Sequence, residues 1–141
     1  MIERENIFPD GLPKRIVKGH VLYSPVVTVV PGKLVFVSGI LARNSKGEIV
    51  GKGDMAAQIR QVFENIKTAL ASVGGNFEHV VKLNSYLTNI EANAAEFREV
   101  RASYFPNRSA LPASTLLQVP RLASPGYLLE VEVIAVLPPR A

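Results

Sequence analysis

The sequence predicts an α+β domain in which two helices pack on one face of a mixed β-sheet. Two segments carry apolar residues at helical spacing, and six short runs have the alternating or β-branched pattern of strands. Their order along the chain is β-β-β-α-β-α-β-β. Because the helices are separated by strands and the connections are short, a layered α+β arrangement fits this order best.

Composition limits the classes of function. The 141 residues suit one domain, 1–141, and with 48% hydrophobic and 20% charged residues the chain is globular. The absence of cysteine excludes disulfides, thiolate nucleophiles and cysteine-ligated zinc. The two histidines, His20 and His79, are isolated, so we expect no metal site. The +4 charge is dispersed, which argues against a nucleic-acid partner.

No segment of the sequence has the character of a membrane span or a secretory signal. The first residues are charged and lack an apolar core, and no apolar run approaches the roughly 20 residues that cross a bilayer. We therefore expect a cytoplasmic protein without a membrane partner.

The N-terminal third is expected to be extended. Residues 1–20 lack a period and are interpreted as an irregular arm, and residues 22–30 as an extended edge segment, because Pro25 cannot donate to a sheet. A turn is expected at Pro31-Gly32. Residues 34–38 have a buried-strand pattern, and residues 48–50 are expected to return as the second strand of a hairpin.

The helices have clear limits. The first is expected to begin after an N-cap at Asp54 and to end at Gly74-Gly75. Its apolar stripe consists of Ile59, Val62, Phe63, Ile66, Ala69, Leu70 and Val73, and its solvated side of Gln58, Arg60, Gln61, Glu64 and Lys67. A cap at Gly51–Asp54 is favoured over an anion-binding turn, since the phosphate-loop spacing is missing.

The C-terminal half alternates strand and helix. Strands are expected at 80–88, 114–119 and 128–136, and a second helix at 92–105, stopped by Pro106. On this helix Arg98 and Arg101 are three residues apart, so they form either a carboxylate clamp or a solvated edge. We favour the solvated edge.

Two carboxylates interrupt the last strand. Glu130 and Glu132 share one face, opposite the apolar residues of the same strand. If Leu116, Leu128 and Ile134 accompany them, that face is too apolar for water, and burial between subunits would desolvate the acids. Desolvation raises the pKa of a glutamate and suits it to proton transfer. The pattern alone leaves a structural interface role and a catalytic role open.

Several segments together resemble the RidA/YjgF/L-PSP family. They are LVFVSG at 34–39, GEIVGKGDMAAQIRQVFENIKTALASVGG at 47–75, VVKLNSYLTNIE at 80–91, PASTLLQVPRL at 112–122 and LLEVEVIAV at 128–136. The resemblance covers about residues 20–137. It implies a chorismate-mutase-like subunit, a homotrimer whose sheets form a central barrel, and ligand clefts between neighbouring subunits. Archetypal members hydrolyse enamines and imines such as 2-aminoacrylate, without a metal or cofactor.

The resemblance also implies a set of site residues. Glu130 matches the glutamate that activates water, Tyr23 the cleft tyrosine of the first strand, and Gly39 the cleft glycine. Ser114 stands where the family has the arginine that grips the substrate carboxylate, and Leu116 replaces a cysteine.

A further departure from the family pattern is Arg98, which occupies the position of the family's cleft asparagine. Because a serine cannot replace a charge-assisted arginine contact, worth roughly 2–5 kcal/mol, we expect weak or absent 2-aminoacrylate deaminase activity. A divergent deaminase is favoured, acting on another small amino or imino acid, for example a 2-aminomuconate-like compound. In it Arg98, or less favourably Arg101, would take over the carboxylate. A non-catalytic metabolite-binding trimer is the alternative, and an endoribonuclease is the least favoured.

Overall fold

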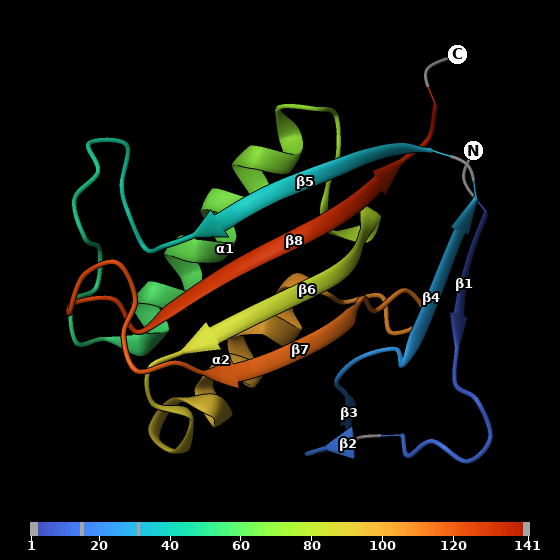
Figure 1. Ribbon diagram of the computed structural model, residues 1–141, viewed down its shortest axis with the longest axis horizontal. Coiled ribbons are helices and arrows are strands. Elements are labelled where there is room, and N and C mark those ends of the chain that lie inside the picture. The colour runs from blue at the N-terminus through green and yellow to red at the C-terminus, as the bar shows by residue number, and fades with distance from the viewer. Residues whose placement is uncertain (1–2, 15, 31, 140–141) are drawn as a thin grey trace.

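The computed structural model describes residues 3–14, 16–30 and 32–139, and its main body is a four-stranded sheet backed by two helices (Figure 1). The helices are α1 (Met55–Ala71) and α2 (Ile90–Tyr104), with a short 3-10 helix, η1 (Phe77–His79), between them. The strands are β1 (Glu3–Ile7), β2 (Ile16–Val17), β3 (His20–Val21), β4 (Val26–Val30), β5 (Lys33–Ile40), β6 (Val80–Leu87), β7 (Ala113–Gln118) and β8 (Leu129–Leu137).

The central sheet is mixed, as predicted. Its order is β5-β8-β6-β7, with β8 antiparallel to both β5 and β6, and β6 parallel to β7. Both helices lie behind the sheet in Figure 1, so one face is covered and the other is bare. This confirms the α+β class with two helices on one face of a mixed sheet.

Helix α1 fixes the core. Asp54 caps it, because its carboxylate accepts a hydrogen bond of 3.1 Å from Ala57 N. The central residues of the expected stripe are fully buried: Ile59, Val62, Phe63, Ile66 and Leu70. Phe63 also packs against a group of aromatic rings from η1, α2 and the residue that follows α2, namely Phe77, Phe97, Tyr104 and Phe105. The periodicity of the sequence therefore predicted this helix and its buried side.

Gln58 was assigned to the solvated side of α1, and that assignment is wrong. The side chain is fully buried. Its Nε2 donates to the carbonyl oxygens of Gly51 (3.2 Å) and Gly126 (2.8 Å), and its Oε1 accepts from Leu128 N at 2.8 Å. The amide thus ties α1 to the loops on either side of it, and its burial is compensated by three hydrogen bonds.

The expected irregular arm contains regular structure. Strand β1 pairs antiparallel with β4 over five residues, and β2 pairs with β3. The β1–β4 pair is a separate two-stranded sheet beside the β7 end of the molecule, not an edge of the main sheet (Figure 1). Arm residues became strands because pairing between 3–7 and 26–30 satisfies their backbone groups, which a search for periodicity in 1–20 could not detect.

Two further expectations of the N-terminal half need correction. Residues 48–50 form no strand, and the hairpin is reduced to one bridge between Arg43 and Ile49. Strand β5 is an edge strand rather than a buried one, since Leu34 is 59% and Phe36 72% exposed. The expected turn at Pro31-Gly32 includes Pro31, which lies outside the described residues.

Among the described residues, none of the helices has the length and apolarity that a membrane span requires.

Candidate functional site

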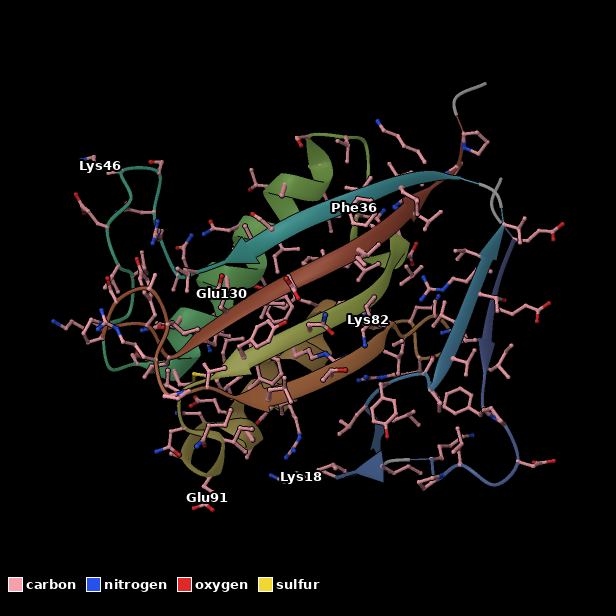
Figure 2. The ribbon with its side chains drawn as sticks, viewed as in Figure 1. Lys18, Phe36, Lys46, Lys82, Glu91 and Glu130 are labelled. Atoms are coloured by element: carbon pink, nitrogen blue, oxygen red, sulfur yellow. The ribbon has the colours of Figure 1, made fainter. Side chains whose placement is uncertain are left out.

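Strand β8 places Glu130 on the bare face of the sheet (Figure 2). Leu129, Val131 and Val133 point to the helices and are buried, so the alternating Glu130 and Glu132 point the other way. This arrangement of the two acids is the one expected from the sequence.

Gly39 and Glu130 are in close approach across β5 and β8. A β-carbon built on Gly39 would overlap Oε1 of Glu130 and lie 2.8 Å from its Cδ. The glycine at this position therefore leaves room for the carboxylate over β5. The two residues that the family resemblance grouped together are thus neighbours.

Glu132 is engaged within its own subunit. Its Oε1 accepts hydrogen bonds from Tyr86 Oη at 2.7 Å and from Asn84 Nδ2 at 3.1 Å. These two hydrogen bonds hold the pKa of Glu132 below its ordinary value, while the same contact raises the pKa of Tyr86. The sequence showed Asn84 and Tyr86 on one face of their strand, but not that they bind an acid of β8.

Glu130 differs from Glu132 in its hydrogen bonding. Tyr86 lies opposite Glu130 in the register of β6 and β8, yet its hydroxyl donates to Glu132. Within the described part of the chain, no group donates a hydrogen bond to the Glu130 carboxylate. Of the two acids, Glu130 is therefore the one whose oxygens remain available to a water molecule or ligand.

A second group of residues lies on the helix side of the sheet, around a cavity of about 290 Å³ between α2 and β7. We call it the α2–β7 cavity. Its lining includes Tyr23, Phe97, Arg98, Arg101, Ser114 and Leu116. The structure thus brings together four residues that the sequence comparison had assigned to ligand binding, along with Arg101.

Arg101 was expected on a solvated edge of α2 and is instead buried, with only 7% of its surface exposed. Its Nη2 is buried and has no hydrogen-bond partner. Burial, helped by the nearby charge of Arg108, lowers the pKa of Arg101 to about 10. The Phe105 ring, 5.6 Å from the Cζ of Arg101, is one of the groups that bury the guanidinium. The spacing of residues along α2 does not reveal this burial, because it depends on what packs against the helix.

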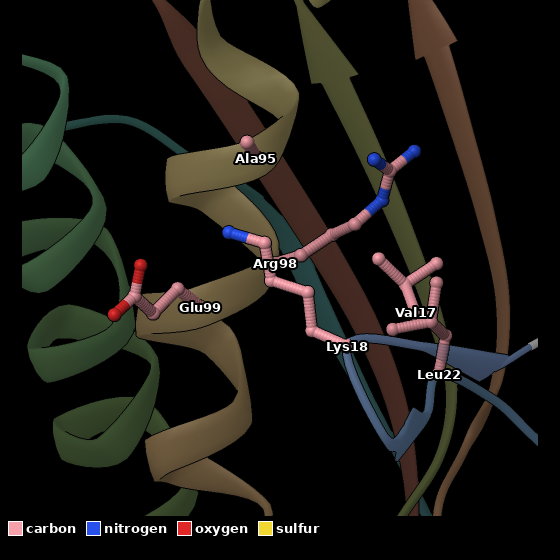
Figure 3. Close-up of a pocket in the computed structure, with 6 residues that line it drawn as sticks. All are labelled: Val17, Lys18, Leu22, Ala95, Arg98 and Glu99. Atoms are coloured by element: carbon pink, nitrogen blue, oxygen red, sulfur yellow. The ribbon is translucent and has the colours of Figure 1, made fainter.

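Arg98 borders more than one cavity. It lines the α2–β7 cavity and also a cavity of about 180 Å³ between α2 and the residues around β2. Figure 3 shows its guanidinium extending from α2 past Val17 and Leu22, while the Glu99 carboxylate points to the opposite side of the helix. Arg98 is half-buried, so it is the more accessible of the two arginines.

The two groups of residues occupy opposite faces of the sheet. In the parallel pairing of β6 and β7, Ser114 lies beside Leu83 and Leu116 beside Ser85, both on the helix side. Leu116, and likewise Leu128, packs against the core, so the expectation that they accompany the glutamates is wrong. Ile134 does border a shallow hollow on the bare face with Glu132. One subunit therefore cannot bring Glu130 to its own α2–β7 cavity.

The described residues contain no group of three or more His, Cys, Asp or Glu side chains that could hold a metal ion.

Comparison with known proteins gives one family. The protein-family model described as Endoribonuclease L-PSP matches residues 15–137 of this chain. The curated 3-aminoacrylate deaminase RutC of Acinetobacter baylyi is 34% identical over 136 residues, covering 94% of this chain and 97% of the relative.

Solved structures of similar proteins support the same family. A conserved Rid-family protein of unknown function, YyfB from Yersinia pestis, superposes with a TM-score of 0.82 at 31% identity, covering 95% of this chain and 98% of the other. E. coli TdcF with bound serine superposes with a TM-score of 0.67 at 30% identity, covering 75% of this chain and 82% of the other.

The close approach of Gly39 and Glu130 predicts the effect of Gly39→Ala. The added methyl group meets the flexible end of a side chain, so the carboxylate moves and the fold remains. We expect the melting temperature to change by less than about 3 °C and any turnover to fall at least about tenfold. Ser45→Ala, in an exposed turn, is the control. Unchanged turnover in Gly39→Ala would show that the position of Glu130 does not matter.

The hydrogen bonds to Glu132 predict a pH-dependent stability. Because the hydrogen bonds hold the folded-state pKa of Glu132 below the ordinary value of 4.5, its ionised form stabilises the fold above that pH. The stabilisation is lost as pH falls through the folded-state pKa. In thermal melts at pH 7 the wild type should have a higher melting temperature than Glu132→Gln. The difference between the two melting temperatures should shrink below pH about 4.5. A difference that is constant with pH would contradict this.

Proposed function

Because this chain belongs to the RidA/YjgF/L-PSP family, we propose that it is a deaminase that hydrolyses a small imino acid, or the enamine in equilibrium with it. The relative RutC is named as a deaminase of 3-aminoacrylate, an enamine acid, which supports this reaction class. TdcF binds serine, an amino acid of similar size.

The observation that carries the proposal is the free carboxylate of Glu130 beside Gly39. In the proposed reaction Glu130 takes a proton from water while the oxygen attacks the imine carbon and the C=N π electrons move to nitrogen. The proton then passes from Glu130 to nitrogen, which gives a carbinolamine. Glu130 next takes the proton of the carbinolamine hydroxyl and returns it to nitrogen as the C–N bond breaks and the C=O bond forms, so that ammonia and a keto acid leave. Backbone amides near Gly39 and Leu116 would hold the water and the substrate.

The substrate is proposed to differ from 2-aminoacrylate. Ser114 supplies a neutral hydroxyl where the archetype has a guanidinium, so the carboxylate of the substrate needs another cation. Arg98 and Arg101 both line the cavity beside Ser114, and they reach it from α2 rather than from β7. A longer acid, such as a 2-aminomuconate-like compound, would suit a site in which an arginine of α2 binds the carboxylate.

The division of the site between two faces supports an assembly of copies, which we propose to be the homotrimer implied by the family resemblance. Glu130 and the α2–β7 cavity can only meet if the bare face of one subunit lies against the cavity of a neighbour. The bare face is also apolar at Phe36 and Leu117, which are 72% and 50% exposed. We therefore propose three copies around a central barrel, with clefts between them.

An endoribonuclease, the activity in the description of the matching family model, is a less favoured function. The net charge of +4 is dispersed over the chain, without the basic stripe that nucleic-acid binding requires.

The test is Glu130→Gln assayed with enzymatically generated imino acids of different chain lengths. Removing the proton acceptor should lower turnover at least about 100-fold, while size-exclusion chromatography shows the same assembly. Glu132→Gln is the matched control on the same strand, and it should retain turnover at pH 7.5, since its carboxylate is engaged by Tyr86 and Asn84.

Full activity of Glu130→Gln would refute the catalytic role. A wild type that binds keto acids without turning over any imino acid would instead favour the alternative of a metabolite-binding trimer, which the serine at position 114 also supports.

A further inference from the structure

We infer that Arg101, rather than the more exposed Arg98, binds the carboxylate of the ligand in the α2–β7 cavity. This inference rests on the proposed function for the kind of ligand, a small keto or imino acid.

The guanidinium of Arg101 is buried but incompletely paired. Only 7% of its surface is exposed, and Nη2 has no hydrogen-bond partner. The causes of its lowered pKa are burial in apolar surroundings and, second, the charge of Arg108, and both disfavour the cation. A buried charge without a counter-charge destabilises a fold, and native proteins seldom keep one unless a bound anion completes it.

The position of Arg101 favours an anion in the cavity. It lines the cavity together with Ser114, whose hydroxyl can donate a further hydrogen bond to a carboxylate oxygen. Phe97 and Leu116 give the same cavity apolar walls, which strengthen an interaction between ions. A volume of about 290 Å³ suits an acid of a few carbon atoms. The cation that the β7 position lacks is thus available from α2, one helical turn beyond Arg98.

The experiment measures binding of 2-oxobutyrate, a small keto acid of the product class, by calorimetry, with its uncharged methyl ester as the ligand control. We expect Arg101→Met to weaken binding of the acid at least about tenfold and to leave the weak binding of the ester unchanged. Because an unpaired buried charge is replaced by an apolar side chain of similar length, the melting temperature should be equal or higher. Arg98→Met, the matched control, should weaken binding less than about threefold.

The outcomes separate this inference from the proposed reaction. Tight binding of the acid by Arg101→Met, or a larger loss in Arg98→Met, would overturn the role of Arg101 whether or not turnover exists. If Arg101→Met does not fold, Arg101→Lys is used instead, since a lysine keeps the positive charge but cannot make the two parallel hydrogen bonds of a guanidinium. That variant should still prefer the acid to the ester but bind it more weakly, and equal affinity for both would overturn the inference.

A second, independent observation concerns strand edges. We propose that β4 of one copy pairs with the outer edge of β5 in a neighbouring copy. Strand β5 is eight residues long and lies at the end of the sheet order, with no partner on its outer side among the described residues. Strand β4 has β1 on one side and, among the residues that the structure describes, no strand on the other. Unpaired edges of this length normally carry charges or prolines that prevent association.

These two edges lack that protection. Strand β4 reads VVTVV and carries no charge, and β5 has a single charge, Lys33, at its first position. Only residues 31–32 separate them, a length typical of a hairpin, yet they do not pair with each other. Two open edges with a single charge between them suit a contact between copies in which β4 of each copy pairs with β5 of the next. Such a contact is heterologous and can close into a ring.

The N-terminal segment is held away from its own β5. Arg4 donates to the carbonyl oxygens of Glu78 and Ala110, at 2.7 and 2.9 Å. Asn6 and Ser24 both donate to the carbonyl oxygen of Leu111, at 2.6 and 2.9 Å. These bonds place the β1–β4 pair near the start of β7, as Figure 1 shows. Strand β4 is therefore not available to β5 of its own copy, which supports the proposed pairing with β5 of a neighbour.

Engineered disulfides test this arrangement, because the chain has no cysteine of its own. If residues 30 and 33 are opposite each other, so are 28 and 35. Copies carrying Thr28→Cys and differently tagged copies carrying Val35→Cys are co-expressed and oxidised. We expect a covalent dimer of the two tagged chains on a denaturing gel. Val27→Cys with Phe36→Cys is the second pair, and Thr28→Cys with Ser45→Cys is the control that should not react.

The rival arrangement is a hairpin within one chain. In that case the double variant Thr28→Cys/Val35→Cys would form an internal disulfide and run as a monomer, and the mixed single variants would not cross-link. That result, or the absence of any cross-link from both pairs, would overturn the exchange of β4 between copies.

Discussion

The constraint on which the rest of the structure depends is that helices cover only one face of the sheet. Alternation along β8 sends the apolar residues into the helix layer and leaves Glu130 and Glu132 on the bare face. The same alternation along β7 turns Ser114 and Leu116 towards α2. The acid and the cationic cavity are thereby separated by the thickness of the sheet, and an assembly of subunits becomes a requirement of the proposed chemistry rather than an addition to it.

The sequence was a good guide wherever local chemistry decides the structure. The stripe of α1, its cap at Asp54 and the alternation of β8 depend on neighbours in the chain, and all three were predicted. It was a poor guide where a distant partner decides. Gln58 is buried because loops at 51 and 126–128 need its amide, and residues 3–7 form a strand because residues 26–30 pair with them. No pattern within either segment records these partners.

The candidate site shows the same division. Comparison of motifs identified Tyr23, Arg98, Ser114 and Leu116, and the structure gathers them around one cavity. It could not show that Arg101 is buried beside them, because a spacing of three residues fits a solvated edge equally well. Nor could it show that Glu132 is engaged by Tyr86, since the contact crosses from β8 to β6. Burial and cross-strand partners are properties of the folded chain.

The bonds that hold the N-terminal segment also bear on how the chain folds during synthesis. Arg4 and Ala110 are 106 positions apart, and Asn6 and Leu111 are 105 apart. The acceptors therefore leave the ribosome long after the donors, and β1 and β4 spend most of translation without the surface on which they finally rest. A segment that stays unattached for so long is open to encounters with other nascent chains on the same message. If β4 pairs with a neighbouring copy as proposed, that contact can form while the subunits are still being made.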